Sequence, residues 1–325
     1  MKARGDRPAI LAHRGDSFRA PENTLEAARL AWQAGADAWE LDVQLTRDGV
    51  PIVLHDQSLL RTTDVARRFA SDPRGQNGFR VSDFDFDEVK TLDAGSWFVA
   101  KDGGPRSAHS FGTFNRLEPA WIEHYRSGRV IIPTLAEALT LTKQQDWLVN
   151  VEIKSFPEGP VGLVERVLEV VEQLEIAARV LISSFDHTDV ALADRPGREH
   201  ALGILTLTPL CRTHDYASDL VGADTVHVST EILGSGTVAY RRERSSSVLR
   251  TVLVEDLKSH GIPILAYTVN DTGAGSLAEH LAQIGVDGLF TDDPQGMKRG
   301  FAAGSDSARR PDLRSGNAGS VTGGR

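Results

Sequence analysis

The sequence is poor in cysteine: Cys211 is the only one among its 325 residues. A single cysteine cannot form a disulfide within the chain, so a small disulfide-stabilised fold is excluded. The fold must instead be held by its core, together with any ligand it binds. We expect a reducing compartment and a cytoplasmic protein, because residues 1–13 also offer no apolar segment of the kind found in secretory signals.

Long apolar runs are lacking as well, and so is an excess of basic residues. No run of about 18 apolar residues occurs, which excludes a membrane-spanning helix. The chain has 36 Lys and Arg against 45 Asp and Glu, a formal net charge of −9. Nucleic-acid-binding proteins usually carry a basic excess, so we expect no nucleic acid as a partner. A site for an anionic substrate would need local positive charge, for example from a metal ion.

Short strand-like runs alternate with helix-length segments along most of the chain. Eight such units predict a (β/α)8 barrel rather than an open sheet, because helices between strands impose parallel pairing. The pair Asp48 and Gly49 predicts a tight turn from the second run into an antiparallel partner at residues 51–55. The expected strands are residues 8–13, 38–45, 147–153, 179–184, 200–206, 225–229, 262–269 and 286–291, and the expected helices include residues 23–35, 161–174 and 249–260.

Two segments interrupt this alternation. Residues 56–133 are too long for an ordinary connection between a strand and a helix, and residues 231–247 contain glycines and a basic run. Loops that follow barrel strands gather at the catalytic face, so we expect both insertions to wall or cover the site. Residues 302–325 are mostly small and polar and predict a disordered tail, which leaves residues 1–301 as the barrel.

Paired charged residues stand on two of the predicted strands. Glu40 and Asp42 are two residues apart, so both point to one face of a strand, and Glu152 with Lys154 repeats this spacing. Buried carboxylates placed side by side repel one another unless a cation lies between them. Three carboxylates from neighbouring strands form an oxygen-rich group, which favours Mg²⁺ or Ca²⁺ over a softer metal.

Histidines and further cations stand at the ends of the first strands. His13 and Arg14 follow the first strand, and His55 follows the hairpin partner of the second. Taken singly, each has a plain structural interpretation, as a hydrogen-bonding histidine or an ion-pair partner. Polar residues at the ends of consecutive strands seldom occur by chance, because charged groups seldom lie unpaired inside a barrel. Arg14 and Lys154 together would supply a planar fork and a point charge for an anionic oxygen.

Several segments match the motifs of one enzyme family in order and spacing. The longest is residues 12–56, and shorter ones are LDAGSW at 92–97, IPTLAEAL at 132–139, VEIK at 151–154, YTVN at 267–270 and VDGLFTDDP at 286–294. With these segments the chain resembles the glycerophosphodiester phosphodiesterases. The resemblance implies a (β/α)8 barrel and a metal-dependent hydrolase with a small-molecule substrate, a glycerophosphodiester or a lysolipid.

The resemblance also implies a role for individual residues. Tyr267 stands where the family usually has Trp, so the fit of the glycerol or alcohol moiety is the part of the site that departs from the family. The implied roles are the acid-base pair for His13 and His55, the ligands of the divalent metal for Glu40, Asp42 and Glu152, phosphate or substrate contacts for Arg14, Lys154 and Tyr267, and support of the metal site for Glu22 and Asn23.

The chemistry of a phosphodiester fits these residue types. Its phosphorus is shielded by anionic oxygens, so hydrolysis needs a cation on a non-bridging oxygen, a base for the nucleophile and an acid for the leaving group. Imidazole can be either base or acid near neutral pH. We expect one histidine to deprotonate the glycerol 2-hydroxyl, which attacks phosphorus while the other protonates the departing alcohol. Water then opens the cyclic phosphate to glycerol 3-phosphate.

Two other functions stay open from the residues alone. The same site could act on lysophospholipids or sphingolipid-type diesters, and an apolar exposed face on residues 98–130 would favour this interpretation. A carbon-carbon lyase could use Lys154 as a Schiff-base amine. The sequence sets neither the departing alcohol, nor the physiological metal, nor the oligomeric state.

Overall fold

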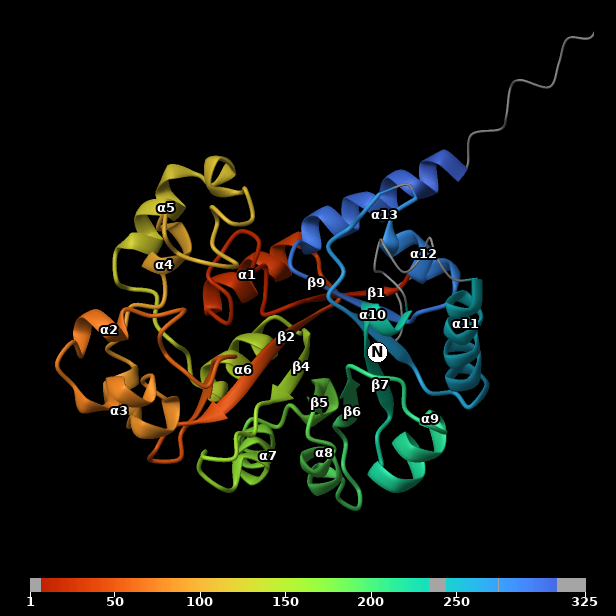
Figure 1. Cartoon of the computed structure of the whole chain (residues 1–325), viewed down its shortest axis with the longest axis horizontal. Helices are drawn as coiled ribbons and strands as arrows, with labels where there is room; N and C mark the ends of the chain where they lie inside the picture. Colours follow the sequence, from red (N-terminus) through yellow and green to blue (C-terminus); the bar gives the residue numbers. More distant parts are fainter. Residues whose placement is uncertain (1–6, 234–243, 274, 309–325) are drawn as a thin grey trace, which may run out of the picture.

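The computed structural model describes residues 7–233, 244–273 and 275–308 (Figure 1). Eight parallel strands close into a barrel, because β1 pairs with β9 on one side and with β2 on the other. This confirms the predicted (β/α)8 barrel, and each expected run contains one barrel strand. The strands are β1 (Ala9–Ala12), β2 (Ala38–Leu45), β4 (Leu148–Ile153), β5 (Val180–Ser184), β6 (Ala201–Thr206), β7 (Thr225–Ser229), β8 (Ile264–Tyr267) and β9 (Gly288–Thr291).

The predicted hairpin is also present. β3 (Pro51–Val53) pairs antiparallel with the end of β2, and Gly49 in the turn has φ 78°, a conformation that suits glycine. This short strand extends the sheet beyond the barrel at β2. It places the residues that follow it, including His55, next to the end of β2.

Helices form the outer layer around the barrel (Figure 1). α1 (Leu25–Ala34) begins where the Thr24 side chain accepts a hydrogen bond from the Ala27 N–H, and it ends at Gly35 in the left-handed conformation. The outer elements are α6 (Leu135–Gln144), α7 (Leu163–Gln173), α8 (His187–Ala193), α9 (Thr213–Asp215), α11 (Arg244–Ser259), α12 (Leu277–Gln283) and α13 (Pro294–Ala308), with the 3-10 helix η4 (Ala177–Arg179) and the π-helix η5 (Tyr216–Val221). The short helix α10 (Thr230–Leu233) directly follows β7 and lies nearer the centre of the view (Figure 1).

The core lies between the barrel and these helices. Trp39 and Trp147 stack with ring centroids 6.2 Å apart, and the Trp39 indole N–H donates to the Thr142 hydroxyl at 2.9 Å. Each indole thus packs its apolar surface while its N–H has a partner. Within the described residues, no helix is long and apolar enough to cross a bilayer.

Two predicted boundaries are wrong. α11 begins at Arg244, so residues 244–247 belong to a helix rather than to an insertion, and α13 runs to Ala308, into the segment expected to be a disordered tail. Neither extension carries a clear apolar period. A helix that is already nucleated can extend at low cost, which a search for apolar periods does not detect. Residues 234–243 and 309–325 lie outside the described residues.

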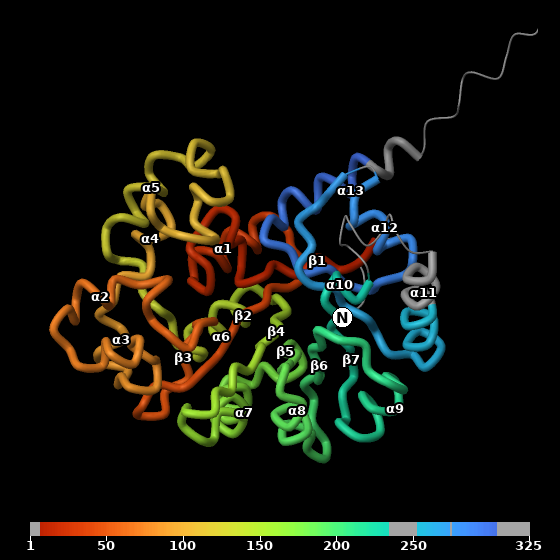
Figure 2. Tube along the Cα trace, in the orientation of Figure 1, coloured from red at the N-terminus to blue at the C-terminus, as the bar shows by residue number. Residues whose placement is uncertain are grey.

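The insertion at residues 56–133 forms two small lobes beside β2 and β3 (Figure 2). The first packs around Phe84, which is buried and lies under the Arg74 guanidinium at 3.7 Å, and the second packs around Phe98 and Tyr125. Each lobe therefore has a core of its own. The first contains α2 (Val65–Arg68), η1 (Pro73–Asn77), η2 (Val81–Asp83) and α3 (Phe86–Val89), and the second contains α4 (Ser96–Val99), η3 (Phe114–Arg116) and α5 (Pro119–Arg126).

A buried histidine lies inside the barrel on β7. His227 is fully buried, and its Nε2 lies 3.0 Å from the Thr225 hydroxyl. Gly203 leaves room for the ring, because a Cβ at that position would lie 2.7 Å from His227 Nε2. Burial lowers the pKa of His227 to about 3.

This burial predicts an acid-sensitive contribution to stability. Above pH about 6.5, His227 is neutral in the folded and the unfolded chain. Between about 6.5 and about 3, only the unfolded chain takes up the proton, so the free energy of unfolding falls by on the order of 1 kcal/mol per pH unit. The neutral variant His227→Gln should show a shallower fall, measured by urea denaturation at successive pH values. Equal slopes in both proteins would contradict this assignment.

Candidate active site

A cavity of about 200 Å³ opens at the carboxyl ends of the barrel strands. Seven of the predicted site residues line it. Of the other three, two form ion pairs with Arg14, and the third donates its backbone N–H to the Arg14 carbonyl at 3.0 Å. The lining comes from both ends of the sequence, because β1 pairs with β2 on one side and with β9 on the other, and β8 pairs with β9. The seven are His13, Arg14, Glu40, His55, Glu152, Lys154 and Tyr267, and the other three are Glu22, Asn23 and Asp42.

The three predicted metal ligands lie together. Glu40 and Asp42 share one face of β2, Asp42 stands in register with Glu152 of β4, and one ligand atom from each lies within 4.8 Å of the others. Burial and the neighbouring carboxylates Asp42 and Glu152 raise the pKa of Glu40 well above its usual range. Within the described residues, Glu40 Oε1 is buried and accepts no hydrogen bond. This unpartnered oxygen beside two carboxylates fits a hard divalent cation.

Two cations and one amide surround Asp42. The Arg14 Nε lies 3.3 Å from Oδ2 and the Lys154 Nζ lies 3.2 Å from Oδ1, while Asn23 Nδ2 donates to Oδ2 at 2.8 Å. Burial alone would raise the pKa of Asp42, but Lys154 and Arg14 hold it well below its usual range. Lys154 also contacts Glu152, and the Arg14 backbone N–H donates to Glu40 at 2.7 Å. Asp42 is therefore a carboxylate, as a metal ligand must be.

Each candidate catalytic histidine is paired with a carboxylate. His13 Nδ1 lies 2.7 Å from Asp292 Oδ1, and His55 Nδ1 lies 2.7 Å from Asp56 Oδ1. A carboxylate accepts hydrogen bonds only, so Nδ1 donates in both pairs and Nε2 is the basic nitrogen. Burial and the nearby Arg14 lower the pKa of His13 to about 4, so this imidazole is neutral near pH 7. Both pairs have the arrangement of a base and its orienting carboxylate.

A buried carboxylate connects the two pairs. Glu22 accepts from Arg14 at 2.7 Å, from Arg61 at 2.6 Å and from Arg106 at 2.6 Å. Burial opposes its ionisation, but these arginines hold the pKa of Glu22 well below its usual range. The second side of Arg61 binds Asp56 at 2.6 Å, and that of Arg106 binds Asp292 at 2.8 Å. Glu22 thus lies at the centre of a network that reaches both histidines.

The carboxyl groups of this network outnumber its cationic side chains. Within the described residues, the network contains six carboxyl groups against four arginine and lysine cations. Ionisation of all six carboxyl groups, which the raised pKa of Glu40 opposes, would leave these four cations two charges short. One divalent cation would neutralise these two negative charges. The carboxylates are Glu22, Glu40, Asp42, Asp56, Glu152 and Asp292, and the cations are Arg14, Arg61, Arg106 and Lys154.

Tyr267 lies on the opposite wall of the cavity. Its hydroxyl donates to the Thr206 carbonyl at 2.8 Å, and its ring packs edge to face with Phe185 at 5.9 Å. The hydroxyl is thus used within the protein, and the ring is the part that faces the cavity. The lining of the site therefore combines charged groups with aromatic rings, and Lys154 Nζ lies 5.6 Å from the Phe185 ring.

Sequence reasoning did not assign roles to Asp292, Arg61 and Arg106. Asp292 directly follows β9, so the rule that catalytic groups follow barrel strands could have found it. Arg61 and Arg106 are 39 and 84 residues from Glu22 and come from loops without a pattern. Both belong to the insertion at residues 56–133, so this insertion reaches Glu22 beside the candidate cavity. The remainder of the second expected cover, residues 234–243, is outside the described residues.

Comparison with known proteins gives the same family over nearly the whole chain. The glycerophosphoryl diester phosphodiesterase family matches residues 13–296. A glycerophosphodiester phosphodiesterase of Caldanaerobacter subterraneus is 32% identical over 286 residues, which cover 88% of this chain and 94% of that protein. One of Bacillus altitudinis is 31% identical over 286 residues, with 88% and 94% covered.

A solved structure agrees with these relatives. An Oleispira antarctica phosphodiesterase, in complex with the product sn-glycerol-3-phosphate, has a TM-score of 0.66 and 27% identity, covering 91% of this chain and 97% of that one. The chain belongs to the glycerophosphoryl diester phosphodiesterase family.

Proposed function

We propose that the protein hydrolyses glycerophosphodiesters to glycerol 3-phosphate and an alcohol in the cavity at the barrel mouth. The observation that carries the proposal is the pair of histidines, each held by a carboxylate, beside three buried carboxylates in one cavity. The Oleispira antarctica structure with sn-glycerol-3-phosphate supports the product. This combination supplies proton transfer and charge neutralisation to one phosphodiester.

Glu40, Asp42 and Glu152 would hold a hard divalent cation, Mg²⁺ or Ca²⁺. When bound, the cation neutralises charge on a non-bridging phosphate oxygen. Arg14 and Lys154 line the same cavity and would bind the remaining anionic oxygen. Positive charge at this mouth is what an anionic substrate requires in a protein of net charge −9.

The two histidine pairs suit opposite roles in the first step. His13 has a pKa lowered to about 4, so it is unprotonated near neutral pH and can accept the proton of the glycerol 2-hydroxyl. His55, held by Asp56, would protonate the departing alcohol oxygen. The 2-hydroxyl oxygen forms the new bond to phosphorus, which gives a cyclic phosphate. Water then opens this ring with the roles of the histidines exchanged.

The structure offers no support for the two other functions. All of residues 98–130 are described, and none of the exposed large hydrophobic residues lies among them. The large apolar side chains Phe111, Phe114, Leu117, Trp121 and Ile122 are partly buried against the core of the second lobe, which does not favour lysolipid substrates. Burial would lower the pKa of Lys154, but Asp42 and Glu152 raise it above its usual range. A protonated amine cannot attack a carbonyl, so Lys154 is unsuited to Schiff-base chemistry.

Chelation is expected to abolish turnover, because the three buried carboxylates lose the charge that balances them. Mg²⁺ or Ca²⁺ should restore activity on a panel of glycerophosphodiesters and lysolipids, and should raise the melting temperature of the chelated protein by mass action. In the Glu152→Gln variant, added cation should restore little activity and raise the melting temperature only slightly. Glu172→Gln, on the exposed face of α7, is the matched control and should behave as wild type. Full activity after exhaustive chelation would disprove the metal assignment.

Replacement of His13 or His55 by Ala should reduce kcat by about 10²-fold or more, as expected for an acid or a base in the transition state. The double variant should be little worse than either single variant, because the groups act as one unit. Initial rates, with circular dichroism as the check on folding, measure both effects. A fully multiplicative loss would argue that the two histidines act independently.

The nucleophile can be tested with a substrate analogue. A glycerophosphodiester with hydrogen in place of the 2-hydroxyl should bind and inhibit but turn over poorly, because attack by that hydroxyl is intramolecular. Phosphorus NMR should detect a transient cyclic phosphate from the ordinary substrate when the second step is slowed. Comparable turnover of the deoxy analogue, with no cyclic species, would show that water attacks directly.

A further inference from the structure

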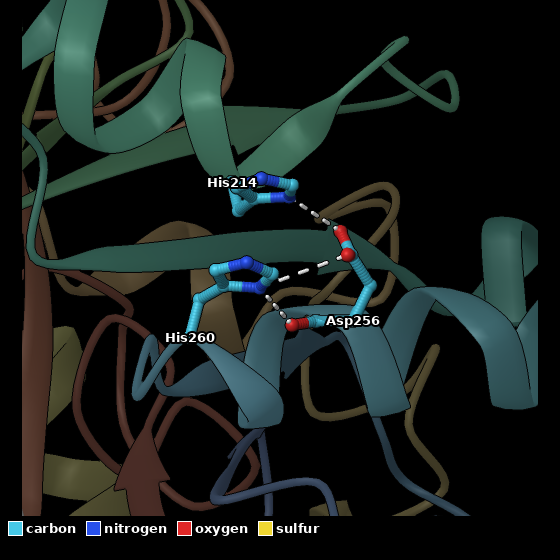
Figure 3. A group of neighbouring side chains, drawn as sticks. All are labelled: His214, Asp256 and His260. Atoms are coloured by element: carbon cyan, nitrogen blue, oxygen red, sulfur yellow. Dashed lines mark hydrogen bonds and ion pairs between the residues drawn. The ribbon is translucent and has the colours of Figure 1, made fainter.

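A second group of metal-ligating side chains lies in the outer layer of the barrel, outside the catalytic cavity. His214 belongs to α9, Asp256 lies in the last part of α11, and His260 follows the end of α11 (Figure 3). Within the described residues, only this group and the three carboxylates of the cavity have three such ligand atoms close together. The mechanism proposed above uses none of the three residues.

The geometry of this group is close to that of a metal site. His214 Nδ1 lies 3.0 Å from Asp256 Oδ2, and His260 Nδ1 lies 3.7 Å from Asp256 Oδ1. The two imidazole rings stack with centroids 3.7 Å apart and an angle of 6°. Around a tetrahedral ion with bonds of about 2.0–2.1 Å, neighbouring ligand atoms lie about 3.3 Å apart. The observed separations lie on either side of that value. Because the parallel rings direct their nitrogen lone pairs into parallel planes, one ring must rotate before both nitrogens can bind the same ion.

A fourth residue orients His214 as metal sites commonly require. Asp215 Oδ1 lies 2.6 Å from His214 Nε2, on the opposite side of the ring from Asp256. Metal-bound histidines usually donate their other N–H to a carboxylate, which fixes the tautomer and the ring orientation. Asp215 Oδ1 accepts from Nε2, and Asp256 Oδ2 accepts from Nδ1 at 3.0 Å, so both nitrogens of metal-free His214 carry protons. An ion bound at Nδ1 must displace the proton there.

We propose that His214, Asp256 and His260 bind a divalent cation that favours imidazole, Zn²⁺ above all. Two imidazoles and one carboxylate are a donor set for Zn²⁺, whereas the oxygen-only group in the cavity suits Mg²⁺ or Ca²⁺. His260 is partly exposed, at 46% of its side chain, so water can fill the fourth position. The bound ion would tie α9, which follows β6, to α11, which follows β7.

The metal-free arrangement shows what the ion must displace. His260 Nδ1 lies 2.8 Å from the Asp256 backbone carbonyl, to which it donates its proton. An ion bound at this nitrogen takes the place of that proton, so one hydrogen bond at the end of α11 is exchanged for a metal bond. His214, Asp256 and His260 would otherwise form only an ion-pair cluster at the protein surface. A measurement of metal binding distinguishes a metal site from a surface ion-pair cluster.

The full-length protein can be titrated with Co²⁺ in excess Mg²⁺, which fills the oxygen-only site. Four-coordinate Co²⁺ absorbs visible light far more strongly than six-coordinate Co²⁺, so the spectrum reports the geometry of the ion. We expect one equivalent of strongly absorbing Co²⁺, displaced by Zn²⁺. His214→Gln and His260→Gln should abolish the band, and Asp215→Asn should weaken Co²⁺ affinity by about 10–100-fold.

Matched controls separate metal binding from folding. His280→Gln, on α12, removes an imidazole from another outer helix and should keep the band. The His260→Gln variant should retain Mg²⁺-supported hydrolysis and its metal-free melting temperature, while losing the rise in melting temperature that Zn²⁺ gives wild type. A band that survives in both His214→Gln and His260→Gln, or that disappears only in Glu152→Gln, would overturn the proposal. Weak six-coordinate absorption in wild type would do the same.

Discussion

The buried carboxylate of Glu22 is the interaction on which the rest of the site depends. An isolated carboxylate in this position would cost several kcal/mol in lost hydration. Three arginines offset that cost, and each also binds a second carboxylate of the site. Loss of one partner from a buried ion pair typically costs about 3–5 kcal/mol, because the remaining charge is left uncompensated. Glu22 therefore fixes the positions of groups that it does not itself touch.

The insertion contributes to this site through two arginines carried on separate lobes. Arg61 holds Asp56, the partner of His55, and Arg106 holds Asp292, the partner of His13. Each lobe packs around its own aromatic residues, so the loops that carry the two arginines are attached to packed lobes. The orientation of each histidine thus depends on the packing of a lobe that lies outside the barrel.

The sequence predicted those features of the structure that depend on residues close together in the chain. Apolar periods located all eight barrel strands, and the two-residue spacing of Glu40 and Asp42 placed their carboxylates on one face. The network around Glu22 could not be predicted, because Arg106 reaches it from 84 residues away through a loop without regular structure. The length of α13 was missed for another reason, since residues beyond 301 add helical turns without adding an apolar face.

The balance of charge also explains why two cationic side chains stand among the proposed metal ligands. Lys154 contacts Glu152 and Asp42, and Arg14 contacts Asp42 and Glu22, so both cations neutralise carboxylates while lining the cavity. Six carboxylates exceed four cations in the network, so Arg14 and Lys154 cannot balance it alone. With a divalent cation supplying the missing charge, Arg14 and Lys154 carry positive charge that an anionic phosphodiester can share. Under the proposed metal assignment, substrate binding and metal binding would therefore be coupled through the same carboxylates.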